Sequence, residues 1–249
     1  MLVKSKVKYI QSLSQKKFRD EEGVFVAEGP KIVNELLSGR EVEPVELYAL
    51  ESWYSNHSQL ISTYDQSSFT VIRPSELERI SFLSTPNEVL GVFRKPQVRD
   101  TKPGTLVLML DNIQDPGNLG TIIRCADWFG ITAIICSPGS ADNFSPKVVQ
   151  SSMTSVVRVQ VTYTDLVQYL HRHDGTRVYA AALDGKSVQA VGPIEGILVI
   201  GNESKGISAE VMALATERIT IPKIGQAESL NAAVATGILL SHLTGAVSK

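Results

Sequence analysis

The sequence predicts an α/β protein whose C-terminal part is built on a mostly parallel sheet. Continuous apolar segments that resemble strands recur after residue 105, and segments of helical character separate them. Strands that are apolar on both faces and alternate with helices are typical of a sheet covered on both sides. The charged, proline-bearing segment RKPQVRDTKPGTL, at 94–106, precedes this alternation. We therefore expect a small domain at 1–97, a linker at 98–105 and a second domain at 106–249.

The composition is that of a globular protein. Of 249 residues, 43% are hydrophobic and 20% are charged. No apolar run approaches the roughly 20 residues of a membrane helix, and the N-terminus lacks the apolar core of a secretory signal. The two cysteines, Cys125 and Cys136, indicate no disulfide framework, which favours a cytoplasmic location. We expect no membrane partner.

The N-terminal part predicts a small α/β unit. Strands are expected in GVFVAEG, PVELYAL, SFTVIR and NEVLGVFR, at 23–29, 44–50, 68–73 and 87–94. A helix is expected at 30–39, because Pro30 suits its first turn and Gly39 suits its end.

A basic segment opens the chain, although the formal net charge of the whole protein is −2. Between residues 4 and 19 every charged side chain is basic, namely Lys4, Lys6, Lys8, Lys16, Lys17 and Arg19. Such a local patch would allow contact with nucleic-acid phosphates. The alternative is a solvated amphipathic helix that packs Val7, Ile10, Leu13 and Phe18 inward.

The C-terminal part predicts six strands. They lie in LVLMLD, ITAIIC, VVRVQV, RVYAAAL, GILVIG and RITIP, at 106–111, 131–136, 156–161, 177–183, 196–201 and 218–222. Helices are expected at 118–130 and from about Thr164, Ser208 and Ser229. Because ligands of such sheets bind at the carboxyl ends of strands, the loops that follow strands are the candidate sites.

The first candidate loop follows the strand at 106–111. Asn118, Gly120 and Arg124 have the pattern N-x-G-x-x-x-R. An arginine in an otherwise apolar helix is costly unless a carboxylate or phosphate pairs with it. Taken alone, this pattern is compatible with either a structural ion pair or a functional arginine.

The second candidate loop, GNESKGIS, follows the strand at 196–201. It nearly matches a phosphate-binding P-loop, but Ile207 stands where that motif requires lysine. No loop supplies the G-x-G-x-x-G of a dinucleotide site either. These absences argue against a nucleotide triphosphatase and against a nicotinamide-dependent oxidoreductase.

The third candidate loop lies in IPKIGQAESLNAAVATGILL, at 221–240. Glu228, Ser229 and Asn231 gather at the mouth of a helix of small and apolar residues. Serine and asparagine there can cap the helix by binding its free N–H groups. They can also face a ligand, and three polar loops after three strands of one domain favour a shared site.

These three loops resemble the ordered motifs of the SpoU (TrmH) family of the SPOUT class, which are S-adenosylmethionine-dependent RNA ribose 2′-O-methyltransferases. The resemblance covers residues from about 106 to the end. AEGPKIVNELL and STPNEVLGV, at 27–37 and 84–92, also resemble the small L30e-like substrate-binding domain of members that act on ribosomal RNA. The resemblance implies a C-terminal trefoil knot and a homodimer.

The resemblance also implies the site residues. The catalytic residues would be Asn118, Arg124, Glu203, Ser229 and Asn231. The S-adenosylmethionine pocket would include Gly201, Asn202, Ile221, Pro222 and Leu230. Because a guanidinium stays protonated, binding of a phosphate and stabilisation of a developing alkoxide suit Arg124 better than the role of a base. Arg124, Glu203 and a substrate phosphate all stay open as the general base.

Substrate and partners follow from the same resemblance. A ribose of 23S ribosomal RNA is the expected target, with transfer RNA as the nearest alternative and a non-catalytic RNA-binding protein as the other. The basic residues between 4 and 19 would contact RNA phosphates, and no DNA partner is expected. The four histidines have no metal-ligand spacing, so no metal is expected.

Overall fold

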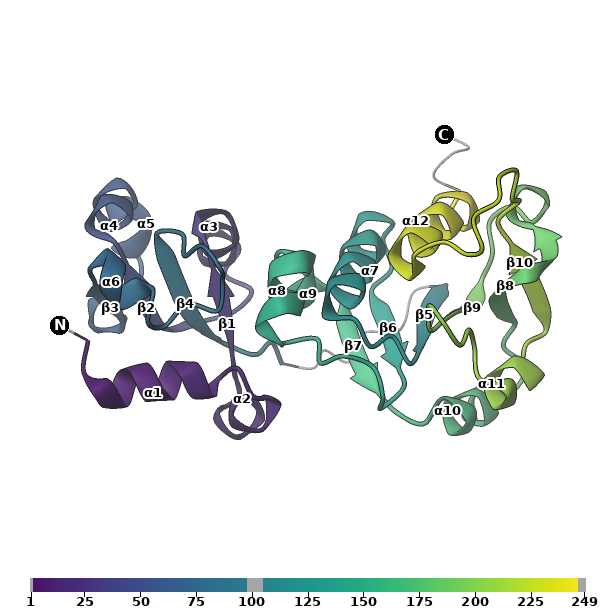
Figure 1. Cartoon of the computed structure of the whole chain (residues 1–249), viewed down its shortest axis with the longest axis horizontal. Helices are drawn as coiled ribbons and strands as arrows, with labels where there is room; N and C mark the ends of the chain where they lie inside the picture. The colour runs from purple at the N-terminus through teal and green to yellow at the C-terminus, as the bar shows by residue number, and fades with distance from the viewer. Residues whose placement is uncertain (1, 98–104, 246–249) are drawn as a thin grey trace. The chain divides into compact units, whose positions relative to one another are not determined.

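The computed structural model describes residues 2–97 and 105–245, which form two compact units (Figure 1). The N-terminal unit comprises Met1–Gln97 and Phe144–Val157, and the C-terminal unit comprises the remainder. Of the predicted linker at 98–105, residues 98–104 lie outside the described part of the chain. The predicted domain limits stay a prediction, but the inclusion of 144–157 in the N-terminal unit was not expected.

The N-terminal unit contains a four-stranded mixed sheet in the order β1-β4-β2-β3. Its strands are β1 (Val24–Glu28), β2 (Pro44–Ala49), β3 (Phe69–Val71) and β4 (Val89–Arg94). Strand β4 pairs antiparallel with β1 and β2, whereas β2 and β3 are parallel. All four strands lie within the segments predicted from the sequence.

Helices cover both faces of this sheet. They are α1 (Lys4–Ser12), α2 (Lys16–Glu22), α3 (Pro30–Gly39), α4 (Glu51–Asn56), α5 (Ser58–Ile61), η1 (Gln66–Ser68), α6 (Pro74–Leu77), α8 (Pro146–Ser152) and α9 (Ser155–Arg158). Strand β1 shows why two cores form, because successive side chains point to opposite faces. Phe25 packs in the core that contains α3, and Val24 and Val26 pack in the core that contains α1.

The segment VVRVQV differs from its predicted strand. Val156 and Val157 lie in α9, and the strand β7 (Gln160–Tyr163) begins only afterwards. Both valines are buried in the N-terminal unit's core with Phe25. Their burial is possible in a one-turn helix as well as in a strand, so a short apolar run did not distinguish the two.

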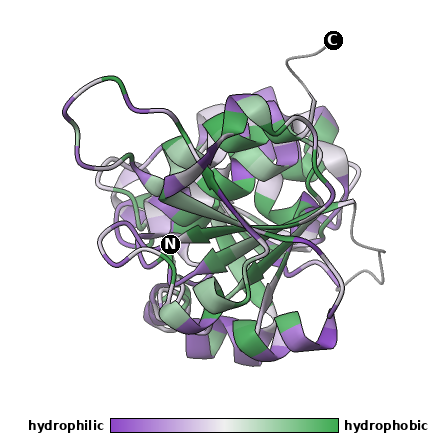
Figure 2. Ribbon diagram, turned by 90° about the vertical axis from the view of Figure 1, so that its right-hand side faces the viewer, coloured by the Kyte–Doolittle hydropathy of each residue, from purple (hydrophilic) through white to green (hydrophobic). Residues whose placement is uncertain are grey.

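The C-terminal unit contains a six-stranded sheet in the order β10-β8-β9-β5-β6-β7, with every pairing parallel. The predicted parallel sheet is thereby confirmed. Its other strands are β5 (Leu106–Asp111), β6 (Ala133–Cys136), β8 (Val178–Ser187), β9 (Gly196–Gly201) and β10 (Glu217–Thr220). Figure 2 shows these central strands in the colour of hydrophobic residues. Strand β5 is buried along its whole length, as a sheet covered on both faces requires.

The helices of this unit are α7 (Pro116–Trp128), α10 (Leu166–Arg172), η2 (Val188–Ala190), α11 (Ala209–Ala213) and α12 (Ala232–Leu243). Helices α7 and α12 lie side by side (Figure 1). Helix α12 begins three residues after the predicted start at Ser229. Within the described ranges, no helix is both long and apolar enough to span a membrane.

Candidate active site

The carboxyl ends of β5 and β9 place two candidate loops next to each other. These strands are parallel neighbours, and their last residues, Asp111 and Gly201, are paired. The buried Asp111 carboxylate then accepts hydrogen bonds from Ser208 N at 2.8 Å and Ser208 Oγ at 2.6 Å. The loop after β9 is therefore tied at both ends to β5.

A tight turn shapes the loop after β9. The Oδ1 atom of Asn202 accepts from Ser204 N at 3.0 Å and Lys205 N at 3.1 Å. The main chains of Asn202 and Gly206 exchange hydrogen bonds of 3.0 and 2.9 Å. A Cβ atom on Gly201 would lie 2.3 Å from the Gly206 carbonyl carbon, so this approach requires glycine.

The start of α7 positions Asn118. Asp115 is the N-cap residue, and its Oδ1 atom accepts from Asn118 N at 2.8 Å. Pro116 occupies the first turn, where its missing N–H is not needed. The Asn118 side chain is therefore held at the mouth of the helix, close to the carboxyl edge of the sheet.

Asn118 joins the three candidate loops through its side chain. Its Nδ2 atom donates to Glu203 Oε1, and its Oδ1 atom accepts from Asn231 Nδ2 at 2.9 Å. Of the five predicted catalytic residues, the structure links these three, with Asn118 bonded to both of the others.

The direction of this hydrogen-bond chain is fixed by the helix that follows. Asn231 Oδ1 accepts from Ala233 N at 3.0 Å and Val234 N at 3.3 Å, because Asn231 caps α12. Asn231 must then present its Nδ2 donor to Asn118, and Asn118 must present its own donor to Glu203. The Glu203 carboxyl group accepts the last hydrogen bond of the chain.

Arg124 and Ser229 stand apart from this network. Both are exposed, and in the described residues neither side chain forms a hydrogen bond to Asn118, Glu203 or Asn231. Arg124 lies six residues after Asn118, or about 9 Å along the helix axis. The cap of α12 is Asn231 rather than Ser229.

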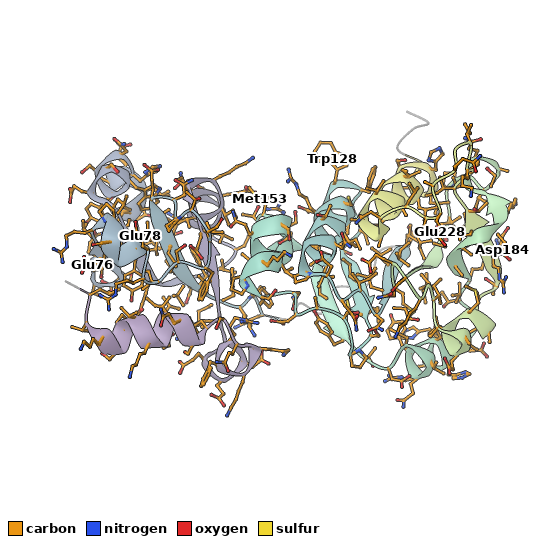
Figure 3. All side chains as sticks on the ribbon, in the orientation of Figure 1. Glu76, Glu78, Trp128, Met153, Asp184 and Glu228 are labelled. Carbon is orange, nitrogen blue, oxygen red and sulfur yellow. The ribbon has the colours of Figure 1, made fainter. Side chains whose placement is uncertain are left out.

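Arg124 shares an exposed face of α7 with Thr121 and Trp128. The Trp128 side chain is 84% exposed and points away from the ribbon in Figure 3. An exposed indole places a large apolar surface in water at this face of α7.

The predicted cofactor residues Ile221, Pro222 and Leu230 lie in a segment without helix or strand. In the described residues, no backbone–backbone hydrogen bond involves 221–230. Leu230 is 45% exposed despite its apolar side chain. Main-chain groups without backbone partners, beside apolar side chains, fit a neutral adenine ring and a sulfonium that needs no phosphate cradle.

Asn202, also predicted for the cofactor pocket, has a structural use for its polar atoms. Its Nδ2 atom donates to the carbonyl oxygen of Asn112 at 2.9 Å, while its Oδ1 atom shapes the turn. Sequence reasoning did not single out Asn112, whose φ of 62° is left-handed. A polar residue directly after a strand was the available signal, because asparagine tolerates this conformation.

The basic N-terminal segment forms two helices, and most of its charges are engaged. Lys6 pairs with Glu46, and Lys16 pairs with Asp20. Lys17 lies 3.8 Å from Glu21. Lys4 and Lys8 are exposed.

Arg19 requires a correction. It was predicted to contact RNA, but its side chain is 1% exposed and its Nη1 atom donates to the Leu13 carbonyl oxygen at 2.6 Å. A buried guanidinium that binds the backbone between α1 and α2 holds this corner together. It is not accessible to a phosphate.

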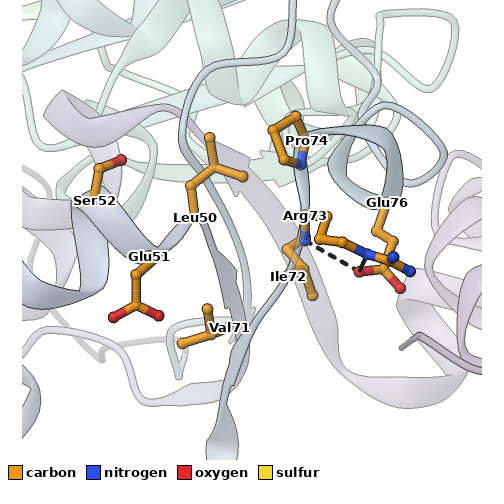
Figure 4. Close-up of a pocket in the computed structure, with 8 residues that line it drawn as sticks. All are labelled: Leu50, Glu51, Ser52, Val71, Ile72, Arg73, Pro74 and Glu76. Atoms are coloured by element: carbon orange, nitrogen blue, oxygen red, sulfur yellow. Dashed lines mark hydrogen bonds and ion pairs between the residues drawn. The ribbon is translucent and has the colours of Figure 1, made fainter.

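A separate pocket of about 530 Å³ lies in the N-terminal unit (Figure 4). Its lining includes Leu50, Glu51, Val71 and Arg73, and Arg73 Nε lies 3.3 Å from Glu76 Oε2. None of the predicted site residues lines it. No group of His, Cys, Asp and Glu residues in the described chain is arranged to hold a metal ion.

Comparison with known proteins identifies both parts of the chain. Residues 105–241 match the SpoU rRNA Methylase family, and residues 4–91 match the MRM3-like substrate binding domain. The 23S rRNA (guanosine(2553)-2′-O)-methyltransferase RlmP of Bacillus subtilis is 32% identical over 247 residues, which are 96% of each chain.

Two solved structures are similar over nearly the whole chain. A TrmH-family protein from Porphyromonas gingivalis is 40% identical, with a TM-score of 0.83 and 97% of each chain covered. An AdoMet-bound rRNA methyltransferase from Sinorhizobium meliloti is 30% identical, with a TM-score of 0.82. That comparison covers 97% of this chain and 94% of the other.

Proposed function

This chain belongs to the SpoU rRNA methylase family, and on that premise we propose that it methylates a ribose 2′-hydroxyl of 23S ribosomal RNA. S-adenosylmethionine is the proposed methyl donor. The observation that carries the proposal is the contact of Asn118 with both Glu203 and Asn231, next to a segment, 221–230, that makes no backbone–backbone hydrogen bond within the described residues. The similarity to RlmP and the N-terminal match favour ribosomal over transfer RNA.

The cofactor pocket is formed by Gly201, Ile221, Pro222 and Leu230. When bound, S-adenosylmethionine supplies a methyl carbon on a positively charged sulfur. The main chain of 221–230 would hold the adenine by hydrogen bonds, and Ile221 and Leu230 would exclude water from it. Gly201 leaves room because it has no side chain.

Glu203 is the proposed proton acceptor. Its Oε1 atom is bound by Asn118, and no hydrogen bond to Oε2 occurs within the described residues. With S-adenosylmethionine bound, its methyl group would pass from sulfur to the ribose oxygen, and Oε2 would accept the hydroxyl proton. Asn118 and Asn231 hold the carboxylate in one orientation, which lowers the cost of alignment.

Arg124 acts as a fixed cation rather than as a base. Its guanidinium binds a phosphate next to the target ribose and stabilises negative charge that develops on the attacking oxygen. Ser229 lies in the same segment as the proposed cofactor residues. Its proposed role is contact with bound S-adenosylmethionine or RNA.

A homodimer is proposed for the α7 and α12 surface. Trp128 on α7 and Val234 on α12 are 84% and 52% exposed, and the two helices lie side by side. A second copy would cover these side chains and remove their apolar area from water. Arg124 shares the exposed face of α7, so its guanidinium would lie at this interface.

The trefoil knot is also proposed rather than observed directly. The chain leaves β10 at one sheet edge and returns as α12 to α7, past the connection between β8 and β9. Helix α12 contacts η2 in that connection, and Ile194 N donates to the Leu243 carbonyl oxygen at 3.0 Å. These contacts support the proposal, because they place the C-terminal helix against the connection through which a knot would pass.

The decisive test is transfer of tritiated methyl from S-adenosylmethionine to separated 23S and transfer RNA. We expect label in 23S RNA, and a loss of at least about 100-fold in Glu203→Gln, the scale of general-base removal. Cofactor binding should persist in that variant. Glu210→Gln, which changes an exposed carboxylate on α11, serves as the control.

Each of the other outcomes would indicate a different function. Label in transfer RNA alone would select the transfer-RNA alternative. Cofactor binding without label in either pool would refute 23S RNA in its free form. Neither binding nor label would leave a non-catalytic RNA-binding protein. Because the proposed substrate is ribosomal RNA, we also propose a cytoplasmic location.

A further inference from the structure

Two lysines on the site loops have no role in the proposed chemistry. Lys205 lies in the turn after β9, and Lys223 lies shortly after β10. Both are exposed, and within the described chain neither forms an ion pair with an acidic side chain. Their ammonium groups are therefore available to bind an anionic ligand.

Lys205 has a fixed place in the molecule. Its backbone N–H donates to Asn202 Oδ1 at 3.1 Å, and the turn closes through the paired main chains of Asn202 and Gly206. Glu203, two residues earlier, is bound by Asn118. The ammonium group therefore extends from a rigid turn that also carries a member of the hydrogen-bond network.

Lys223 lies in the neighbouring loop. It stands two residues after Ile221 in the segment whose last member, Asn231, donates to Asn118. The two lysines thus belong to the two loops that meet at Asn118. Each loop also carries an acidic residue, since Glu203 lies two residues before Lys205 and Glu228 lies five residues after Lys223. The positive charge of these two loops is consequently confined to the Lys205 and Lys223 side chains.

Three of the five N-terminal lysines differ in this respect. Lys6, Lys16 and Lys17 each have a carboxylate partner, whereas Lys4 and Lys8 are exposed. Binding of RNA at the three paired lysines would compete with existing ion pairs, which reduces the net electrostatic gain. Lys205 and Lys223 would bind RNA without giving up an ion pair of this kind.

We propose that Lys205 and Lys223 bind backbone phosphates of the RNA strand on the two sides of the target ribose. The proposal rests on the proposed function, because it assumes an RNA substrate at this site. Lysine suits this role as a flexible point charge that contacts a phosphate without reading a base. The two contacts set the register of the strand over Glu203 and leave sequence choice to other residues.

Equilibrium binding of a fluorescent single-stranded fragment of 23S RNA, measured over a series of KCl concentrations, tests the proposal. Each phosphate contact on a single strand contributes about 0.7 to the slope of log K against log salt. Lys205→Gln and Lys223→Gln should each reduce the slope by about 0.7, and the double variant by about 1.4. The losses should be the same for a scrambled fragment.

The controls separate charge from folding. Lys205→Arg keeps the charge and should keep the wild-type slope. Lys16→Gln removes a lysine that already pairs with Asp20 and should change the slope much less. Binding of S-adenosylmethionine, measured by calorimetry, should be unchanged in all variants.

The proposal is overturned if the double variant keeps the wild-type slope, or if Lys16→Gln lowers it equally. It is also overturned if the variants lose cofactor binding together with RNA affinity, because the lysines then support the loops. A wild type that binds RNA with the expected slopes but transfers no methyl group would refute the proposed function alone.

Discussion

Asn118 offers the sharpest test of the hydrogen-bond network, because aspartate has nearly the same shape. In Asn118→Asp, the atom that donates to Glu203 becomes an oxygen, while the acceptor for Asn231 remains. Two carboxylates then face each other without a proton between them. A hydrogen bond to a charged group contributes about 1.5–3 kcal/mol, so its loss predicts a fall in kcat/KM of about 10- to 150-fold at neutral pH.

The pH dependence of this variant gives the second readout. Repulsion between the two carboxylates raises the pKa of one of them. As the pH falls through that raised pKa, one proton is held between the pair and the network regains a donor and a single negative charge. The deficit of the variant relative to wild type should therefore shrink at low pH. Asn118→Ala cannot hold this proton, so its deficit should stay constant.

The assay is the rate of methyl transfer over a pH series, with cofactor binding measured in parallel. Cofactor affinity should change little, because Asn118 is not among the residues assigned to the cofactor pocket. Wild-type kcat/KM in the aspartate variant, or deficits of the two variants that vary alike with pH, would refute the reasoning.

Three other predictions concern stability and reactivity. Gly201→Ala should destabilise the protein by about 1–3 kcal/mol, because the new Cβ would meet main chain at 2.3 Å; Gly225→Ala, with nothing within 4 Å, should be nearly neutral in urea unfolding. Arg40→Gly should stabilise by about 1 kcal/mol in the same assay, since Arg40 has a φ of 53°, and a destabilised variant would contradict this. Burial raises the pKa of the Cys136 thiol to about 12, so mass spectrometry should detect its alkylation near pH 8 only after unfolding; rapid labelling of the native protein would be the contrary result.

Much of the fold could be predicted because burial and chain direction leave clear patterns. The run Leu106–Asp111 has no polar residue before its last position, which is typical of a strand inside a parallel sheet. Pro30 and Gly39 defined α3 at both ends. The local pattern did not distinguish a helix from a strand at α9. Val156 is buried there in a helix, although a strand was predicted.

The candidate site was predictable in part for a similar reason. Asn118, Glu203 and Asn231 follow different strands of one parallel sheet, so their convergence follows from topology. The internal bonding of Asn202 and the burial of Arg19 could not be predicted. Both depend on which partners the folded chain brings within hydrogen-bond distance, and a positive charge in a sequence does not show whether it is already neutralised.

The helical segment Phe144–Val157 has a consequence for synthesis of the chain. Val149, Val156 and Val157 share a core with Phe25 and Ala27, yet they are made after β5, α7 and β6. During synthesis, the apolar side chains around Phe25 and Ala27 therefore stay exposed until residues 144–157 have left the ribosome. A nascent chain at this stage is a natural client for a chaperone, and a fragment that ends at residue 97 should aggregate for the same reason.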